Sequence, residues 1–513
     1  MTTVAPGRSL PDIPAAPNPS AQAVLLARAY EEVRKVALVH SFEYRGRHTM
    51  VDPVTGVTFD LSPTAFLSAA ALASRLSGDD LARSLEAIGV VEAEQLLHDI
   101  LRLEAQGMFR RSALSSARFH EGAARAYLSQ TPRKMMLLVS QTCNLRCVYC
   151  YAIEGNFADT GRLMSLARAQ DAIRFLDRRS GRRRSMTVTL FGGEPLTNFA
   201  MIRDLVPWAK AYAASVGKRI HFTITTNGTL LSDEVIDFLI AHEFSVMVSL
   251  DGPRDVQNHN RPNVAGAGSF DLAAPRIQRL LERHQHPESI KVRATMTHQF
   301  HDTAALAGFF ASFGFRRIGL GANVGFAFDK GPYDLTANDR DEIYCQTEAL
   351  IHETGLARIR RYERAAYNPL ASALLSLHKL KGKRGPKPKI GCGVGRNDQA
   401  VDVDGKLYPC HRYVGMTTYE IGNIYDGLDQ RKLEEYYRRV LGAHAVCDDC
   451  WATRWCAGHC AQYLSHTAGH VVAPDTAACD TIRRNVERSI ALYDLLSSEG
   501  LDWERLNNEV GED

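Results

Sequence analysis

Three cysteines in one short loop constrain this chain more than any other feature. The stretch QTCNLRCVYCY, residues 141–151, places Cys143, Cys147 and Cys150 in the spacing CxxxCxxC, directly after an apolar run. Three thiolates can hold three corners of a [4Fe-4S] cubane, and the fourth iron is then open to another ligand. A structural zinc site or unrelated core thiols are the alternatives, because soft thiolates also suit zinc.

Length and composition set the broad class of the protein. A chain of 513 residues with 45% hydrophobic and 23% charged residues predicts two to four globular domains. No apolar run approaches the ~18 residues of a membrane span, and the proline-rich N-terminus lacks the apolar segment of a signal peptide. Ten of the eleven cysteines fall in two clusters, which predicts metal or redox ligands in a cytoplasmic protein. The net charge of +3 does not suggest a nucleic-acid partner, and no membrane partner is expected.

The first hundred residues alternate between helix-like and strand-like patterns. Residues 21–39 have helical periodicity, and residues 40–61 alternate apolar and polar positions around two turns, which predicts three short antiparallel strands. Ser62 and Pro63 are typical of a helix N-cap and first turn, and a further helix is expected over 91–106. Strands followed by helices predict a compact module without a cluster of catalytic residue types.

Apolar β-like runs then alternate with helical segments. The six runs are 135–140, 186–191, 221–226, 245–250, 290–297 and 316–324. Repeated βα units predict a parallel sheet with right-handed crossovers, and six units predict an incomplete barrel.

Polar or glycine-rich motifs follow the first four runs. The three-cysteine loop follows the first, and GGEP (192–195), TTNG (225–228) and SLDG (249–252) follow the next three. Each motif alone indicates only a turn. Because the C-terminal face of a parallel barrel carries its active site, four motifs in phase predict a site around the cysteines.

The cysteine spacing, with Tyr149 before the last cysteine, resembles the signature of the radical S-adenosylmethionine (SAM) superfamily. The resemblance implies that SAM chelates the open iron of a [4Fe-4S] cluster, whose electron cleaves SAM to a 5'-deoxyadenosyl radical. It implies a SAM carboxylate at Arg261, the adenine beside Tyr149, the amino group at GGEP and the ribose or methionine at Ser249. The cofactor-binding residues so implied are Tyr149, Gly192, Gly193, Glu194, Pro195, Asn227, Ser249 and Arg261. No catalytic residue is assigned beyond the cluster; a solvated Arg261 and a Tyr149 that shields the cluster from water are the alternatives.

A second group of seven cysteines lies between residues 390 and 480, where little helix or strand periodicity is visible. Its members are Cys392, Cys410, Cys447, Cys450, Cys456, Cys460 and Cys479. Their order resembles the SPASM extension of radical SAM enzymes, which implies two auxiliary iron-sulfur clusters. By this resemblance Cys447, Cys450, Cys456 and Cys479 hold the outer cluster, and Cys392, Cys410 and Cys460 hold the inner one. The inner cluster lacks a fourth protein thiolate, and a substrate thiolate, a non-cysteine side chain or water are the candidates; zinc is the alternative for the CxxC part.

His411 follows Cys410 in the stretch YPCHRYVG. Formylglycine-generating sulfatase maturases share this architecture and resemble one another in an Asp at that position, where it acts as base. The missing carboxylate counts against that reaction. A histidine can in principle accept a proton, but a structural or supporting role is expected for His411.

Residues 36–485 as a whole resemble radical SAM/SPASM peptide maturases. Residues 40–110 resemble the winged-helix module with which such enzymes bind a leader peptide by strand addition; an adaptor or dimerisation module is the alternative. The resemblance implies a cross-link, here a Cys thioether, made in a small ribosomal precursor peptide, with an external flavodoxin- or ferredoxin-type electron donor. Carbon–carbon cross-linking, sulfatase-type maturation and a non-catalytic metal-stabilised peptide-binding protein remain alternatives.

The expected fold class is α/β, with a partial (β/α)6 TIM-like barrel between a winged-helix-like module and a SPASM domain. The expected domains are a disordered tail with a leading helix (1–35), the recognition module (36–115), the radical SAM barrel (134–340), a helical bridge and basic linker (341–389), the SPASM domain (390–485) and a C-terminal helix (486–513). The bridge carries the eleventh cysteine, Cys345, which is expected to be a small buried residue without a role.

Overall fold

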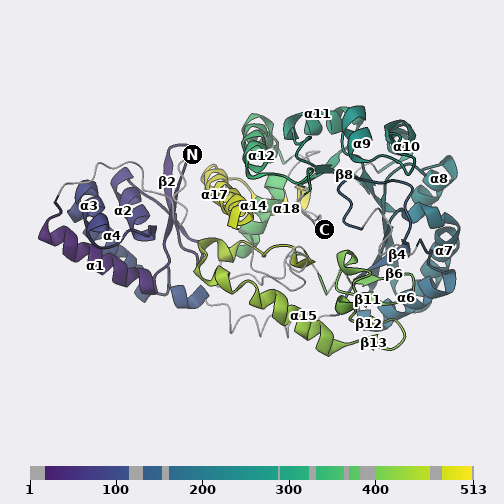
Figure 1. Ribbon diagram of the computed structural model, residues 1–513, viewed down its shortest axis with the longest axis horizontal. Coiled ribbons are helices and arrows are strands. Elements are labelled where there is room, and N and C mark those ends of the chain that lie inside the picture. Colours follow the sequence, from purple (N-terminus) through teal and green to yellow (C-terminus); the bar gives the residue numbers. More distant parts are fainter. Residues whose placement is uncertain are drawn as a thin grey trace.

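An eight-stranded sheet forms the centre of the molecule (Figure 1). The computed structural model describes residues 18–114, 131–152, 161–286, 289–322, 331–362, 369–381, 383, 392, 394–395, 399–462 and 476–510. The strand order is β11-β10-β4-β5-β6-β7-β8-β9, and all neighbours from β10 to β9 are parallel. The six predicted runs are confirmed as strands, with ends that differ by at most two residues: β4 (Lys134–Ser140), β5 (Ser185–Gly192), β6 (Arg219–Thr226), β7 (Ser245–Ser249), β8 (Ile290–Met296) and β9 (Arg317–Ala322).

Helices follow the strands and cover the convex side of this curved sheet (Figure 1). They are η2 (Pro195–Asn198), α6 (Leu166–Ser180), α7 (Phe199–Ser215), α8 (Asp233–Ala241), α9 (Arg254–Asn260), α10 (Phe270–Arg283) and α11 (Thr303–Phe313). The predicted partial barrel of parallel strands is therefore confirmed.

Strand residues alternate between the helix layer and the concave side of the sheet. In β5, Val188 and Leu190 are fully buried in the core with the helices, whereas Thr189 and Phe191 are half-buried. The Thr223 hydroxyl of β6 donates to the Thr189 hydroxyl across the concave side at 2.8 Å. Because side chains alternate with period two, the less buried face of each strand lines the inside of the barrel.

Two strands of the sheet come from the cysteine-rich segment, which the sequence predicted to have little regular structure. Strand β10 (Ala400–Val401) pairs in parallel with β4, and β11 (Leu407–Tyr408) pairs with β10. Helix α15 (Gln430–Gly442) buries Tyr437 and Val440 on one face. That prediction was therefore wrong: two-residue strands carry no visible period, but the apolar spacing of α15 is helical.

The N-terminal part is a three-stranded antiparallel sheet packed on four helices, as Figure 1 shows at the left. The three predicted strands are present, and the Ser62 side chain caps its helix by accepting from Ala65 N. One helix, α3, was not predicted. α1, which the sequence analysis set apart, packs into the same core as the other helices. The elements are α1 (Ala21–Val36), β1 (His40–Tyr44), β2 (Arg47–Val51), β3 (Thr58–Asp60), α2 (Pro63–Ala73), α3 (Gly78–Ile88), α4 (Val90–Ala105) and η1 (Arg111–Leu114).

The other face of the small sheet packs against the C-terminal helices. Phe42 and Val51 share a buried cluster with Trp451 and with residues of α14 and α17. The Arg454 side chain, 1% exposed, joins three segments here, because it donates to Val54 O at 2.8 Å, to Leu380 O at 2.6 Å and to Lys383 O. The N-terminal module is thus fixed to the cysteine-rich segment.

The remaining elements link the barrel to this interface. Cys345 is exposed on α12, so its predicted burial was wrong. The predicted disordered tail and most of the predicted basic linker lie outside the described residues. Among those residues, no helix combines the length and the apolarity needed to cross a membrane. The elements are α12 (Ala337–Leu350), η4 (Ile351–Gly355), α13 (Leu356–Arg360), α14 (Pro369–Leu380), η5 (His411–Tyr413), η6 (Thr417–Tyr419), β12 (Gly422–Asn423), β13 (Gly427–Leu428), η7 (Ala445–Asp449), η8 (Trp451–Arg454), α17 (Thr476–Ser498) and α18 (Trp503–Val510).

We expect Arg454→Met to weaken the attachment of the N-terminal module. The variant leaves three carbonyl groups without their donor in a buried place, which costs about 2 kcal/mol or more of unfolding free energy. Urea unfolding followed by circular dichroism measures this loss. The control Arg438→Met removes only an exposed pair with Glu434 and should change stability by less than ~0.5 kcal/mol; equal stability of both variants would contradict the role of Arg454.

Candidate functional site

The CxxxCxxC loop is held against the segment that follows α9. Arg146 N donates to Pro262 O at 2.7 Å, and Val148 N donates to Asn260 O at 2.9 Å. Cys147 therefore lies at the C-terminal end of the parallel strands, where the sequence predicted the site.

The three thiols of this loop lie close enough to interact electrostatically. Burial raises the pKa of Cys147 to about 12, and the nearby charges of Cys150 and Cys143 raise it further. Burial likewise raises the pKa of Cys143 to about 11. Three half-buried cysteines on one loop become thiolate ligands when a positively charged group binds them, and an iron-sulfur cluster is a group that fits this donor set.

The glycine pair of GGEP allows the second strand to approach this loop. Gly192 has φ +147°, and a Cβ there would lie 2.0 Å from Ser140 O. Gly193 N donates to Ser140 O at 3.0 Å, and Glu194 N donates to Thr142 O at 2.9 Å. A side chain at position 192 would therefore push the cysteine loop away from β5.

The carboxylate of Glu194 is fully buried and connects the ends of β5 and β6. It accepts hydrogen bonds from the Thr226 hydroxyl at 2.8 Å, from Asn227 N at 2.7 Å and from Leu196 N at 3.1 Å. Burial raises the pKa of Glu194 to about 7, and these hydrogen bonds oppose the rise. A carboxylate has about four acceptor positions, two on each oxygen. Asn227 N uses one of the two positions on Oε2. The other position can accept a hydrogen bond from an ammonium group.

The predicted residue Asn227 lies beside the first cysteine. Its Nδ2 donates to Asn144 Oδ1 at 2.9 Å and lies 3.9 Å from Cys143 Sγ. The Leu145 N–H donates to the same sulfur at 3.4 Å. Donors of this kind stabilise a thiolate ligand.

Tyr149 and Arg261 form a buried polar chain with Asp251 of the SLDG motif. The Tyr149 hydroxyl donates to Asp251 Oδ2 at 2.7 Å and accepts from Arg261 Nη1 at 2.8 Å. Burial lowers the pKa of Arg261, but the negative charges around it, beginning with Cys147, raise it well above its usual range. Arg261 Nε is buried and has no hydrogen-bond partner among the described residues. The SAM contacts predicted for Tyr149 and Arg261 stay predictions, and Asp251 is a site residue that the sequence analysis did not select.

Ser249 and Arg293 are neighbours on adjacent strands, β7 and β8. Ser249 is half-buried and Arg293 is open to the concave side of the sheet. Loss of hydration and the positive charge of Arg412 lower the pKa of Arg293. Arg293 was missed, although the alternation of Lys291, Arg293 and Thr295 with apolar residues in β8 indicates which side chains face the barrel interior.

The seven later cysteines fall into two groups. Cys410 interacts electrostatically with Cys460 and Cys392, and Cys479 interacts with Cys450 and Cys456. Cys447 lies in the same turn as Cys450, since Cys450 N donates to Cys447 O at 3.1 Å. These are the groups that the sequence analysis assigned to the inner and outer clusters, and the ligand roles stay predictions.

A site for a single metal ion needs a different arrangement of side chains from a site for an iron-sulfur cluster. In the part of the chain that the structure describes, no group of three or more His, Cys, Asp or Glu side chains is arranged to hold one metal ion.

His411 joins the two cysteine regions inside the barrel. Its ring lies 4.8 Å from Phe191 of β5 and 5.6 Å from Tyr151, which follows Cys150. Burial and the charges of Arg412 and Arg293 lower the pKa of His411 to about 3. Its lowered pKa keeps the imidazole neutral near pH 7, and its Nδ1 is buried without a hydrogen-bond partner among the described residues.

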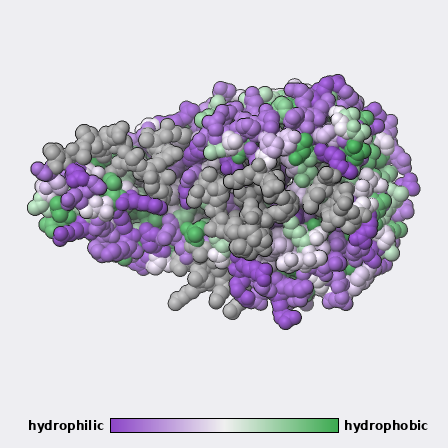
Figure 2. All heavy atoms as spheres, viewed as in Figure 1, coloured by the Kyte–Doolittle hydropathy of each residue, from purple (hydrophilic) through white to green (hydrophobic). Residues whose placement is uncertain are grey.

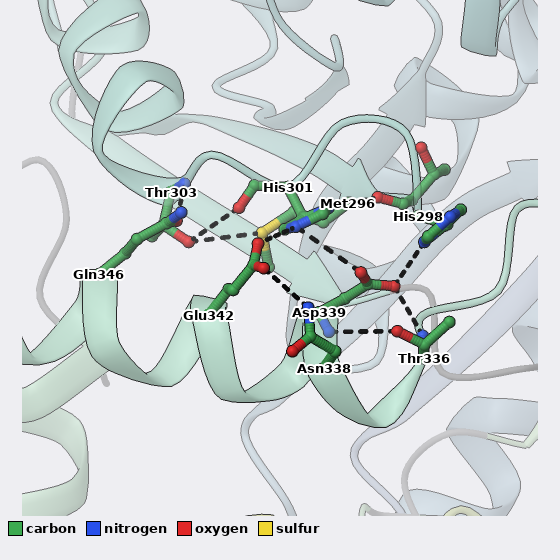
Figure 3. A network of polar contacts seen from close by, with 10 residues as sticks. Met296, His298, His301, Thr303, Thr336, Asn338, Asp339, Glu342 and Gln346 are labelled. Carbon is green, nitrogen blue, oxygen red and sulfur yellow. Dashed lines mark hydrogen bonds and ion pairs between the residues drawn. The ribbon is translucent and has the colours of Figure 1, made fainter.

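A network of charged residues fixes α12 to the loop after β8 (Figure 3). Asp339 lies between two histidines, with its Oδ2 2.8 Å from His298 Nδ1 and its Oδ1 3.8 Å from His301 Nε2. His301 Nε2 is 3.0 Å from Glu342 Oε2, and His301 Nδ1 is 3.2 Å from Thr297 O. Both neighbours of the His301 ring are acceptors, so the geometry favours the imidazolium.

We expect the first turn of α12 to open more often at alkaline pH. Burial lowers the pKa of His301, but its hydrogen bonds to Glu342 and Thr297 and the Asp339 charge outweigh this and raise the pKa above the ordinary 6.5. The stabilisation is complete below pH 6.5 and is lost as pH rises through the raised value. Amide hydrogen exchange of α12 at several pH values measures the opening. His301→Gln should remove the pH dependence; a dependence that persists in this variant would refute the role of His301.

Comparison with known protein families and structures shows which proteins the chain is similar to. Residues 137–302 match the model of the Radical SAM superfamily. These residues form a radical SAM domain. The chain is 23% identical over 337 residues to the cysteine-type anaerobic sulfatase-maturating enzyme of Clostridium perfringens, which covers 63% of this chain and 86% of the relative. It is also 23% identical over 389 residues to the radical SAM cyclopropyl synthase TigE of Paramaledivibacter caminithermalis, with 72% of this chain and 77% of the relative covered.

Solved structures show the same fold at low sequence identity. Native anSMEcpe with bound AdoMet has a TM-score of 0.59 and 18% identity, and the match covers 71% of this chain and 100% of that one. Native anSMEcpe with bound AdoMet and Kp18Cys peptide has the same TM-score, with 70% and 98% covered. The chain thus shares its fold with a protein whose structure contains both AdoMet and a peptide.

Proposed function

We propose that this radical SAM enzyme installs a cross-link, a Cys thioether, in a ribosomally made precursor peptide. The observation that carries the proposal is the contact between Tyr151 and His411, which joins the loop of Cys143, Cys147 and Cys150 to the inner cysteine group. The concave side of the barrel is thereby bordered by two cysteine groups of three members each.

Cys143, Cys147 and Cys150 would hold the SAM-binding cluster. That cluster, when bound, supplies the electron that cleaves SAM to a 5'-deoxyadenosyl radical. The chain's own residues position the reactants: Glu194 fixes the loop and offers an acceptor to the SAM ammonium group. The neutral His411 borders the space left for a substrate.

The inner group favours a thioether over a carbon–carbon bond. Cys392, Cys410 and Cys460 provide three thiolates, so a fourth position remains for a thiolate of the substrate. In the sulfatase-type alternative, a base is expected where His411 lies. An imidazole with a pKa of about 3 accepts a proton poorly near neutral pH, which argues against that reaction.

The free edge of β3 is the proposed site for the leader peptide. Asp52 N donates to Val57 O, and Leu61 N donates to His48 O, so residues 57, 59 and 61 bond inward to β2. The backbone groups of Thr58 and Asp60 therefore point outward, where no strand among the described residues pairs with them. Val57 and Leu101 are exposed on this module. Figure 2 shows a few hydrophobic residues among hydrophilic ones at the left end of the molecule, where this module lies. An edge of this kind can bind an extended peptide by strand addition.

Asp60→Pro should weaken binding of the leader peptide about tenfold or more, because proline removes an outward N–H donor. Asp60→Ala is the matched control, since it also loses the ion pair with Arg47 but keeps the N–H group. Fluorescence anisotropy with a labelled leader measures both. Equal affinities of the two variants would exclude this edge as the docking site.

Arg293→Gln should weaken SAM binding by about tenfold or more, as expected when a charged hydrogen bond worth ~1.5–3 kcal/mol is lost. We infer this role from the position of Arg293 beside Ser249, facing the barrel interior. Arg261→Gln, by contrast, should lower iron content, because Arg261 balances the charge of Cys147. Equilibrium binding of SAM and iron analysis separate the two. If Arg293→Gln keeps its iron and binds SAM with unchanged affinity, Arg293 does not contact SAM. Arg261 then remains the candidate for the SAM contact.

Co-expression with the small peptide encoded beside the gene tests the proposed reaction. Mass spectrometry should find a loss of two hydrogens per cross-link and one cysteine that is no longer alkylated. A peptide of unchanged mass, made beside an enzyme that cleaves SAM, would contradict the function; loss of two hydrogens without loss of an alkylation site would favour a carbon–carbon bond. An external flavodoxin- or ferredoxin-type electron donor remains part of the proposal.

A further inference from the structure

The outer cysteine group has side-chain donors aimed at its sulfur atoms. His459 Nε2 lies 3.3 Å from Cys479 Sγ. His459 itself is held through its backbone, because His459 N donates to His444 Nε2 at 3.4 Å. The Nδ1 atom of the fully buried His444 lies 2.8 Å from Val440 O. A carbonyl oxygen only accepts, so His444 carries its proton on Nδ1 and accepts at Nε2.

This chain of contacts settles the direction of the last hydrogen bond. A cysteine that ligates a metal is a thiolate and offers only lone pairs. His459 Nε2 must then carry the proton and donate to Cys479. The hydrogen bonds that join Val440 to His444 and His444 to His459 hold the His459 backbone in place. A fixed backbone limits the His459 ring to a few orientations.

Arg483 supplies a second donor to the same group. It lies four residues after Cys479 on α17, so both side chains project from one face of the helix. Its guanidinium hydrogen-bonds Cys450, and its Nη1 also donates to Asp480 Oδ1 at 2.7 Å. A guanidinium keeps its proton in proteins, so Arg483 is a cation.

The surroundings of Cys450 make these donors more effective. Trp451, only 1% exposed, follows Cys450 and stacks on His40 of the N-terminal module with ring centroids 3.7 Å apart. The Trp455 ring lies 6.0 Å from that of Trp451. Aromatic rings exclude water on this side, and hydrogen bonds are electrostatically stronger where the local dielectric is low.

We propose that His459 and Arg483 are positioning residues that raise the reduction potential of the outer iron-sulfur cluster. A reduced cluster carries one more negative charge than an oxidised one, so N–H donors and a cation beside its sulfurs stabilise the reduced form more. This inference rests on the proposed function only in that it assumes a cluster at this site.

The raised potential gives the outer site a role in the proposed reaction. Forming C–S from an S–H and a C–H breaks both bonds. One hydrogen atom goes to the adenosyl radical, the thiol proton goes to solvent, and one electron remains to be removed. An oxidised cluster held by Cys447, Cys450, Cys456 and Cys479 would supply the acceptor for that electron, and the donors His459 and Arg483 would favour its reduction.

Redox titration of the outer cluster tests the proposal. The holoenzyme with Cys143, Cys147 and Cys150 all replaced by alanine keeps only the auxiliary clusters, and electron paramagnetic resonance follows their reduction. In this background His459→Leu and Arg483→Met should each shift the midpoint potential of one cluster to more negative values, and the double variant further. Arg483→Lys, which keeps the charge, should shift it less.

Arg484→Met is the matched control, because the adjacent Arg484 pairs with Asp341 rather than with a thiolate. It should leave both potentials unchanged. The proposal would be overturned if His459→Leu and Arg483→Lys kept their full iron content and showed unshifted midpoint potentials. It would also be overturned if His459→Leu alone lost iron, because His459 would then be a cluster ligand. If iron analysis found no iron in the unsubstituted enzyme, both this proposal and the proposed function would be contradicted.

Discussion

The buried carboxylate of Glu194 is the interaction on which the site depends. A carboxylate without water is costly unless hydrogen bonds replace its hydration, and Glu194 obtains them from Thr226, Asn227 and Leu196. Through these bonds the ends of β5 and β6 are joined, and the backbone of Glu194 holds the cysteine loop. The carboxylate thus aligns the strand ends beside the loop that carries the three thiols.

The cysteine-rich segment contributes strands to the central sheet and is not a separate appendage of the barrel. Strand β10 extends the sheet beside β4, and His411, which follows Cys410, contacts Tyr151, which follows Cys150. On the far side the same segment receives the N-terminal module through Trp451 and Arg454. The N-terminal module, the outer cysteine group and the barrel are thus joined in one continuously packed structure.

Much of the fold follows from local patterns in the sequence. The six strands were predictable because each is a short apolar run, and the first four runs are followed by a polar or glycine-rich motif. The pairing of Ser249 with Arg293 was not, because it depends on the register of two strands joined by a long connection. The contacts of His459 with Cys479 and of His40 with Trp451 likewise join distant segments. Their residue types gave no signal, since a lone histidine is equally common in an ordinary core.

The central claim is that Cys143, Cys147 and Cys150 leave one iron open for SAM. Formation of 5'-deoxyadenosine by the anaerobically reconstituted enzyme, with SAM and a chemical reductant, measures it most directly. The account predicts 5'-deoxyadenosine from the unmodified chain and none from Cys147→Ala, while the auxiliary iron of that variant remains. Stoichiometric zinc with little iron, or 5'-deoxyadenosine formed equally by Cys147→Ala, would contradict the account.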